Sequence, residues 1–313
     1  MERKSVKTGI FPPLLVVGEI LYDVFPDYRR IGGAPFNFAC HMRRFGFPVR
    51  FLTRVGDDVE GGELRRVLEA EGFDPCDVQV DRELPTGEVN VRLNEKGVPE
   101  FTILPERAYD RLDLSAEASR MQENPALVYY GTLIQRTEKL RLDLARFLDA
   151  RSPRTRCFCD INLRPRCYGR ESVKSSLARA DVLKISEEEA ETLQALHDFE
   201  GGGEAFAREL MRRYPAEMLF LTRGDRGSDL FCRGEHYRTP SPAVSGSGDT
   251  VGAGDGYAAV AAAGYLLGWS PELILREASE FAARICGIRG ALPREVSFYH
   301  GIRRRMEEGG GDV

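Results

Sequence analysis

Short apolar runs of strand length alternate with longer segments of helical periodicity along most of this 313-residue chain. Parallel strands need crossover connections of about this length, so the alternation predicts βαβ units. We expect an α/β fold: a doubly wound, mainly parallel sheet with helices on both faces. The expected strands are residues 14–18, 49–55, 126–131, 156–161, 182–185 and 218–222, and the expected helices include 63–70, 138–150, 187–196 and 204–214.

One part of the chain departs from this alternation. Residues 86–104 are strand-like on both sides of Asn94-Glu95-Lys96-Gly97, which predicts a hairpin turn, and residues 21–25 are also β-prone. These segments predict a small sheet apart from the main one, acting as a lid; an extension of the main sheet is the alternative. We therefore expect a single domain, 1–313, with a β lid from about 20–31 and 85–105, and a disordered tail over 306–313.

The composition excludes several classes of protein. The 44 basic and 49 acidic residues give a net charge of −5, which argues against a general nucleic-acid binder. Seven cysteines and four scattered histidines form neither a disulfide framework nor a zinc-site spacing. No apolar run reaches membrane-spanning length and the N-terminus lacks a signal-peptide pattern, so we expect a cytoplasmic protein without membrane contact.

The most informative stretch is GSGDTVGAGDG, residues 246–256, which leads into a helix of small side chains. It lacks the Lys of a Walker A loop, and no strand precedes it as a dinucleotide fingerprint requires. What remains is a glycine turn at the start of a helix. There the amides of Gly252, Ala253, Gly254 and Asp255 are expected to be free of intrahelical partners and to converge on an anion.

Asp255 stands directly beside this predicted anion site. The helix dipole and the local amides are expected to favour its ionised form. Because a carboxylate is repelled by a bound phosphoryl group, a purely structural role does not explain its position. A general base that takes a hydroxyl proton during phosphoryl transfer does. The alternative is that Asp255 is an N-terminal cap.

A second glycine pair, Gly32-Gly33, also precedes a predicted helix that contains Asn37 in its first turns. Asp23 follows the first predicted strand. In sheets of this type ligands bind beyond the carboxyl ends of the strands, so these polar groups could hold sugar hydroxyls. Taken alone, Asn37 is better explained as a buried hydrogen-bonding residue than as a ligand contact.

Together these stretches resemble the ribokinase-like sugar kinases of the phosphofructokinase-B family. The resemblance extends from about Val16 to Pro293. It rests on the Gly-Gly-x-x-x-Asn stretch from Gly32 to Asn37 and on Asp249-Thr-Val-Gly-Ala-Gly-Asp255. The resemblance implies an ATP- and Mg²⁺-dependent kinase in which Asp255 is the catalytic base, Gly252, Ala253 and Gly254 form the anion hole, and the β lid covers a sugar.

Further roles follow from the resemblance alone. Sugar binding is implied for Asp23, Gly32, Gly33, Asn37 and Arg164, the last in Asp160-Ile-Asn-Leu-Arg164. Nucleotide binding is implied for Ser186, Thr222, Gly224 and Gly254, organisation of Mg²⁺ through water for Glu189, and a monovalent cation such as K⁺ for Asp249 and Val251. Ser186 departs from the family pattern, which has Asn there. A homodimer formed through the lid is a further expectation.

The sugar is suggested by finer similarities. Residues 18–26, Gly32-Gly33-Ala34-Pro35 and Pro85-Thr86-Gly87 are most similar to fructokinases, which implies conversion of D-fructose to fructose 6-phosphate. Within the same family, 2-keto-3-deoxygluconate kinase, ribokinase and nucleoside kinase are the alternatives. A non-catalytic nucleotide or sugar sensor is a rival from another class, and the intact Asp255 argues against it.

Overall fold

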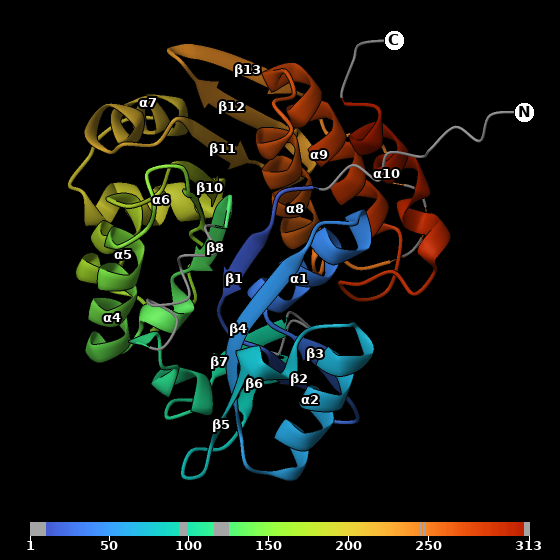
Figure 1. The fold of residues 1–313 in the computed structure, drawn as a ribbon. Coiled ribbons are helices and arrows are strands. Elements are labelled where there is room, and N and C mark those ends of the chain that lie inside the picture. The colour runs from blue at the N-terminus through green and yellow to red at the C-terminus, as the bar shows by residue number, and fades with distance from the viewer. Residues whose placement is uncertain (1–10, 94–98, 116–124, 245, 247, 310–313) are drawn as a thin grey trace, which may run out of the picture.

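The computed structural model describes residues 11–93, 99–115, 125–244, 246 and 248–309. Its centre is a nine-stranded sheet in the order β13-β12-β11-β10-β9-β8-β1-β4-β5 (Figure 1). Neighbouring strands from β11 to β5 are parallel, and the β12–β13 hairpin adds two antiparallel strands at one edge. The strands are β1 (Leu14–Val17), β4 (Val49–Gly56), β5 (Val78–Asp81), β8 (Leu127–Gly131), β9 (Arg156–Asp160), β10 (Val182–Ser186), β11 (Met218–Thr222), β12 (Ser228–Cys232) and β13 (Glu235–Thr239).

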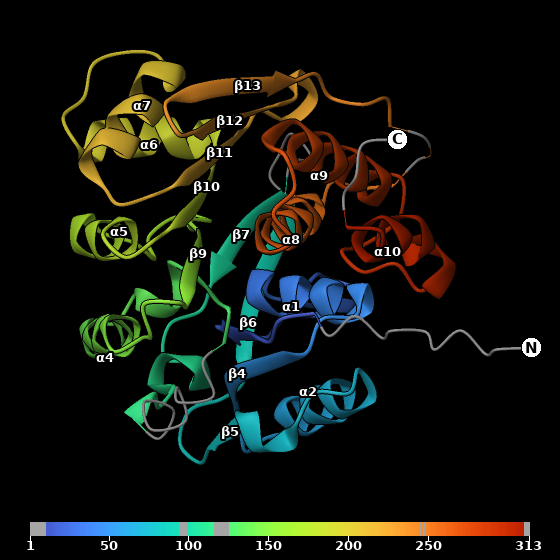
Figure 2. The same ribbon diagram turned by 45° about the horizontal axis from the view of Figure 1, so that its top comes forward.

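Helices cover both faces of this sheet, as the alternation predicts. Figures 1 and 2 show α4 to α7 on one face and α1, α2, α8, α9 and α10 on the other. No helix in the described ranges is both long and apolar enough to cross a lipid bilayer. The helices are α1 (Ala34–Phe45), α2 (Val59–Ala70), α4 (Glu138–Asp149), α5 (Arg170–Leu177), α6 (Glu187–Leu196), α7 (Gly203–Arg213), α8 (Ala253–Leu266), α9 (Pro271–Cys286) and α10 (His300–Glu307).

The central strand β1 is apolar along its whole length because both of its faces are buried. In β1, Leu14 and Val16 pack into the core beneath α1 and α8, whereas Leu15 and Val17 pack into the core beneath α4 to α7. Successive strand side chains point to opposite faces, so one continuous apolar run supplies both cores. The doubly wound α/β fold predicted from the sequence is therefore confirmed.

A separate four-stranded sheet is formed by β2 (Leu21–Val24), β3 (Arg29–Gly32), β6 (Gly87–Leu93) and β7 (Pro99–Ile103). Its order is β3-β2-β6-β7, and none of these strands pairs with the nine-stranded sheet. The alternative of an extended main-sheet edge is therefore wrong. The hairpin turn predicted at 94–97 lies outside the described residues, although β6 and β7 on either side of it are antiparallel. We call this sheet the small sheet.

The chain order within the main sheet reverses between β1 and β8. From β1 the chain passes outward through β4 to β5, and it then returns to β8 and continues through β9 and β10 in the other direction. Loops that leave the carboxyl ends of neighbouring strands diverge at such a switch point and leave a crevice between them. Polar residues that follow the carboxyl ends of the strands beside this switch point are therefore expected around the crevice.

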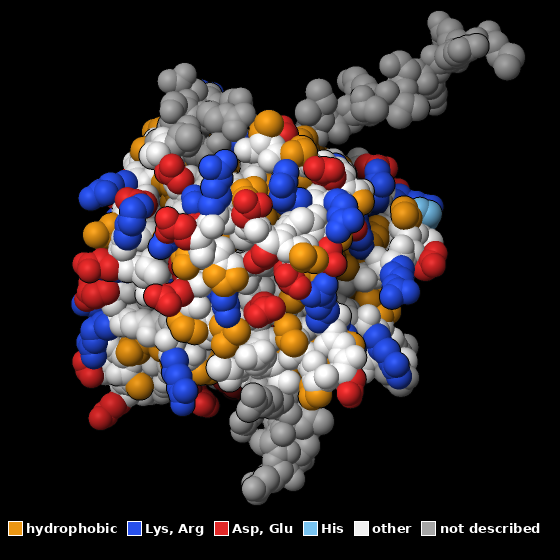
Figure 3. Space-filling model, turned by 90° about the horizontal axis from the view of Figure 1, so that it is seen from below, with side chains coloured by type: hydrophobic (Ala, Val, Ile, Leu, Met, Phe, Trp, Pro, Cys, Tyr) orange, Lys and Arg blue, Asp and Glu red, His pale blue; other side chains and the backbone are white. Residues whose placement is uncertain are grey.

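Some features were not predicted. The sequence predicts no strand at β5, β12 or β13; β13 has the polar sequence EHYRT and is only partly buried, so it lacks the apolar run that marks a central strand. At residue 306, where the sequence predicts the start of a disordered tail, the chain is still helical: α10 continues to Glu307 and Met306 is buried in the core. Residues 310–313 lie outside the described ranges. On the face in Figure 3, positive and negative side chains are interspersed and neither sign forms a continuous field.

Candidate active site

A pocket of about 330 Å³ lies between the small sheet and the start of α8. Asp23, Gly32 and Gly33 line it from the small sheet and its junction with α1, and Arg164 lines it from the loop after β9. The structure thus brings most predicted sugar and anion-hole residues to one place, together with the predicted base Asp255 and with Val251 of the predicted cation site: Asp23, Gly32, Gly33, Asn37, Arg164, Gly252 and Gly254. The lining does not include Asp249, Ala253, Ser186, Glu189, Thr222 or Gly224.

The glycine turn has a conformation that needs glycine at Gly252. This residue has φ of 79°, in the left-handed region, and forms the N-cap of α8. A Cβ atom there would lie 2.3 Å from the Cβ of Ala291, so a side chain is excluded by space as well as by dihedral angle. The amide of Ala253 donates to the carbonyl of Thr250 at 3.3 Å, which differs from the expectation that it is free. Within the described chain, the amides of Gly252, Gly254 and Asp255 have no such backbone partner.

Asp255 is the third residue of α8, and its carboxylate accepts a hydrogen bond of 2.7 Å from Nδ2 of Asn37. It is not the N-cap, because that position is Gly252, so the capping alternative is wrong. Burial raises the pKa of Asp255 to about 6, although the Asn37 hydrogen bond and Lys184 oppose the shift. The expectation that the helix start favours the ionised form is therefore corrected: desolvation outweighs the Asn37 hydrogen bond and the nearby positive charges.

The other polar atom of Asn37, Oδ1, is buried without a hydrogen-bond partner among the described residues. Asn37 itself is 5% exposed and lines the pocket. A buried amide oxygen without a partner is costly, so this atom is available to a hydroxyl donor in the pocket. Asn37 therefore both positions Asp255 and offers an acceptor to a ligand.

Asp23 occupies the space that a side chain at Gly32 would need. A Cβ atom on Gly32 would lie 2.6 Å from Oδ2 of Asp23, and one on Gly33 would lie 2.6 Å from the carbonyl oxygen of Glu19. Gly33 also has φ of 110°. Burial raises the pKa of Asp23, and Arg164 and Arg30 act in the opposite direction. The glycine pair thus lets a carboxylate and a backbone carbonyl approach the first turn of α1 closely.

Ser186 and Glu189 form a reciprocal capping box at the start of α6. Oγ of Ser186 accepts from the amide of Glu189 at 3.2 Å, and Oε2 of Glu189 accepts from the amide of Ser186 at 2.7 Å. Oε1 of Glu189 accepts from the amide of Leu163 at 2.7 Å, which ties the loop after β9 to the end of β10. A serine caps a helix as well as an asparagine does, so the departure from the family pattern keeps this local structure.

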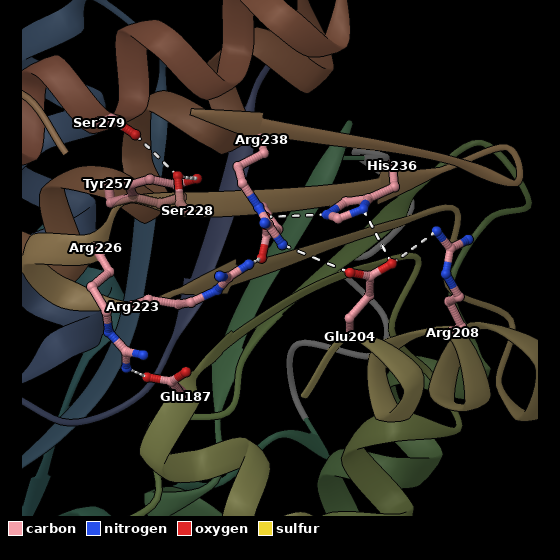
Figure 4. A network of polar contacts seen from close by, with 11 residues as sticks. Glu187, Glu204, Arg208, Arg223, Arg226, Ser228, His236, Arg238, Tyr257 and Ser279 are labelled. Carbon is pink, nitrogen blue, oxygen red and sulfur yellow. Dashed lines mark hydrogen bonds and ion pairs between the residues drawn. The ribbon is translucent and has the colours of Figure 1, made fainter. Parts of the chain in front are cut away.

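Thr222 ends β11 and Gly224 begins the 3₁₀ turn after it. The neighbouring Arg223 and Arg226 belong to a network of ion pairs (Figure 4). Arg223 pairs with Asp229 of β12, which is fully buried, and Nε of Arg238 lies 2.7 Å from the same carboxylate. Arg226, in the 3₁₀ turn η5 (Gly224–Arg226), pairs with Glu187 at the start of α6. The loop that carries Thr222 and Gly224 is therefore fastened on both sides, to β12 and to the helix that begins after Ser186.

Asp249 lies outside the pocket lining, and its carboxylate is fully engaged. Oδ2 lies 3.1 Å from a guanidinium nitrogen of Arg30, which belongs to the small sheet. The amide of Val251 donates to Oδ1 at 3.1 Å, and the amide of Gly290 lies 3.3 and 3.2 Å from the two oxygens. A monovalent cation needs oxygen ligands free of other donors, so this carboxylate does not fit one while Arg30 is paired with it.

Four charged groups of the pocket were not predicted from the sequence as site residues: Glu19, Arg30, Asp160 and Lys184. Lys184 of β10 lies between the carboxylate of Asp160 and the glycine turn, and Glu19 follows β1 and is 4% exposed. Burial raises the pKa of Glu19 to about 7. Glu19 directly follows the strand predicted at 14–18, so the position that singles out Asp23 could also have found Glu19. Lys184 lies inside the strand predicted at 182–185, where a lysine within an apolar run is the signal.

Comparisons with known proteins identify the family of this chain. The model of the pfkB family carbohydrate kinases matches residues 17–294, and the chain belongs to this family. A fructokinase of Klebsiella pneumoniae is 30% identical over 301 residues, which cover 87% of this chain and 91% of that protein.

Two solved structures have the same fold. An uncharacterised sugar kinase of Pyrococcus horikoshii in complex with ATP has a TM-score of 0.77 at 24% identity and covers 94% of this chain and 99% of its own. A protein of Escherichia coli named as a putative ribokinase II, with ATP and Mg²⁺, has a TM-score of 0.77 at 19% identity and the same coverage.

Proposed function

We propose that this protein is an ATP-dependent sugar kinase that transfers the γ-phosphoryl group to a sugar hydroxyl, with D-fructose as the acceptor and fructose 6-phosphate as the product. The observation that carries the proposal is the position of Asp255. Its carboxylate is held by Asn37 at 2.7 Å, directly after a glycine turn with unpartnered amides and beneath the small sheet.

In this proposal Asp255 takes the proton of the sugar hydroxyl as the phosphoryl group arrives. A pKa of about 6 leaves the carboxylate ionised at neutral pH, yet closer to the operating pH than an ordinary aspartate, which suits a general base. The amides of Gly252 and Gly254 would hold the charge that develops on the phosphoryl oxygens. Asp23 and Oδ1 of Asn37 would bind sugar hydroxyls, and closure of the small sheet as a lid would exclude water.

Mg²⁺ is expected to arrive with the nucleotide. In the described part of the chain no group of three or more His, Cys, Asp or Glu could hold a metal ion alone, which agrees with an ion bound mainly by phosphates and water. Glu189 is the residue that would organise its water ligands. Mg²⁺ would supply positive charge between the nucleotide phosphates. On the nucleotide side, Thr222, Gly224 and Ser186 would lie along the phosphates.

The choice of fructose rests on similarity to named fructokinases. Besides the Klebsiella protein, a fructokinase of Escherichia coli is 28% identical over 272 residues. One observation favours 2-keto-3-deoxygluconate as a second candidate: Arg164 lines the pocket, and within the described residues no acidic group forms an ion pair with it. An unpaired guanidinium is a suitable partner for the carboxylate of a sugar acid.

A coupled assay of ADP release distinguishes these functions. The purified protein would be tested with ATP and Mg²⁺ against fructose, glucose, ribose, 2-keto-3-deoxygluconate and nucleosides. Sugar-dependent ADP release, with fructose first in kcat/KM, supports the proposal. A preference for the sugar acid that is lost in Arg164→Met would support the second candidate. No ADP release with any acceptor, in a protein that still binds ATP, would support a sensor.

Two further expectations belong to this proposal. Activation by K⁺ at Asp249 and Val251 would require displacement of the Arg30 guanidinium, so we expect rates in K⁺ and in choline buffers to agree within about twofold. A homodimer through the small sheet would cover Tyr28 and Phe101, which are about half exposed. Analytical ultracentrifugation of the wild type and of Tyr28→Asp tests this dimer.

A further inference from the structure

Lys184 is a buried lysine for which the reaction as described above has no role. It is 6% exposed, and its Nζ lies 2.9 and 3.1 Å from the two carboxylate oxygens of Asp160. Asp160, at the end of β9, is 1% exposed and also lines the pocket. The hydroxyl of Tyr129 lies 3.4 Å from Oδ2 of Asp160 on the buried side. The ion pair is thus rigidly held at the floor of the pocket.

The position of Nζ relative to the glycine turn is the important feature. Gly254 is helical and has no positive φ, so its backbone does not require glycine. A Cβ atom on Gly254 would point at Lys184 and lie 3.5 Å from Nζ. The missing side chain therefore leaves a gap between the amide of Gly254 and the ammonium group. A ligand oxygen in that gap would meet donors from both sides.

The hydrogen-bond capacity of Lys184 agrees with this arrangement. An ammonium group has three N–H donors, and Asp160 takes two of them. No third acceptor for Nζ is found in the ranges that the structure describes. Burial raises the pKa of both Asp255 and Glu189, and the positive charge of Lys184 opposes the shift at both, so it acts on the candidate base and on the candidate magnesium residue.

We propose that Lys184 contacts the γ-phosphoryl group and stabilises it during transfer, opposite the amides of the glycine turn. This inference rests on the kinase function proposed above. The hydroxyl oxygen of the sugar forms a bond to the γ-phosphorus while the bond to the β–γ bridging oxygen breaks. The hydroxyl proton passes to Asp255, ADP leaves with the electron pair, and Lys184 stays protonated throughout. Its charge neutralises the equatorial phosphoryl oxygens, and Asp160 fixes its position.

The alternative is that Lys184 only neutralises the buried Asp160. A neutral double variant separates the two roles, because Asp160→Asn with Lys184→Met leaves no buried charge unpaired. The set also contains Asp160→Asn alone, Lys184→Met alone and, as a matched control, Lys174→Met, which removes an exposed lysine of α5. Thermal unfolding identifies any variant that fails to fold.

We expect Lys184→Met to lower kcat by about 10²–10³-fold, and the double variant to remain at least about tenfold below Asp160→Asn. Calorimetric titration provides a readout that a structural role would not change. The double variant should lose about tenfold in affinity for AMP-PNP, which has a γ-phosphoryl group, and should bind ADP within about threefold of the wild type. Lys174→Met should match the wild type in both assays.

A double variant that recovers the kcat of Asp160→Asn, or that weakens ADP and AMP-PNP equally, would overturn the role of Lys184 and leave the kinase proposal intact. If the wild type binds neither nucleotide, the proposed function fails, and the inference fails with it. These two failures are therefore distinguishable.

Discussion

Asp255→Asn tests the central step, since it replaces only one carboxylate oxygen with an amide nitrogen. The amide oxygen of the substituted side chain can still accept from Nδ2 of Asn37, so the 2.7 Å contact that positions the residue is retained. The variant loses the ability to take a proton. Loss of a general base costs about 10²–10⁴-fold, and we expect kcat to fall by at least that range while ATP and sugar still bind.

The raised pKa of Asp255 predicts a second, independent effect of Asp255→Asn, which is a change in stability with pH. It rises from 3.8 to about 6 because of burial, and each tenfold change in proton affinity corresponds to about 1.4 kcal/mol, so ionisation costs the folded state up to about 3 kcal/mol. Because burial favours the protonated form of Asp255, the folded state carries no such cost below about pH 4, where the carboxyl is protonated. The cost appears, and this stability is lost, as the pH rises through 6. The side chain in Asp255→Asn cannot ionise, so the variant avoids this loss of stability at high pH. The melting temperature of the variant should therefore exceed that of the wild type by more at about pH 8 than at about pH 4.

Three measurements check these expectations. Coupled ADP release gives kcat, calorimetry gives the two dissociation constants, and thermal unfolding at the acidic and the basic pH gives the stability difference. In the wild type, kcat/KM for the sugar should fall about tenfold per pH unit below pH 6, because only the ionised carboxylate accepts the proton. A variant that keeps more than about a tenth of wild-type kcat would refute the base assignment.

The remaining predictions concern the anion hole, the sugar site and the substrate. Gly254→Ala should fold normally, because its Cβ would make only ordinary contact 3.5 Å from Nζ of Lys184, yet kcat should fall by about 10²-fold; unchanged kinetics would contradict the anion-hole assignment. Asp23→Ala should raise the sugar KM by about 10–100-fold with the ATP KM within about twofold, since it removes a charge-assisted hydrogen bond; an unchanged sugar KM would move the sugar site elsewhere. Fructose should have the highest kcat/KM among free sugars, with phosphorylation at O6 verified by NMR; a roughly tenfold preference for another acceptor would end the fructokinase assignment but not the kinase assignment.

The sequence was sufficient for six of the nine strands of the main sheet, because burial on both faces leaves a strong local signal. The strands predicted at 14–18 and 218–222 are observed as β1 and β11 within one residue at each end. The β12–β13 hairpin gave no such signal. β12 is fully buried, but it contains Asp229, whose charge is neutralised by Arg223 from the preceding loop and by Arg238 from β13. A charged residue in the middle of a strand is a local contradiction that only the folded arrangement resolves.

In the candidate site, too, some features could be predicted from the sequence and others could not. The glycine turn could be predicted because Gly252, Gly254 and Asp255 are neighbours in the chain and their roles depend on local geometry. The pKa of Asp255 could not be predicted, because it depends on burial beneath the small sheet and on Asn37, Asp160 and Lys184 from distant segments. The helix dipole considered alone gives the wrong sign for the same reason.

The pairing of Asp249 with Arg30 shows how far such long-range contacts alter the chemistry that a motif implies. The two residues are 219 positions apart, and Arg30 also stacks over the rings of Phe25 and Tyr28 within the small sheet. Each partner of the ion pair is about one-third exposed, so the pair contributes little to stability, roughly 0–1 kcal/mol. The pair matters instead for the position of the small sheet relative to the anion hole. Arg30 joins the small sheet to the residues that precede the anion hole, so any movement of that sheet over the pocket must break, keep or exchange this contact. The residues from Asp249 to Asp255 therefore have to be understood together with the strand that reaches them.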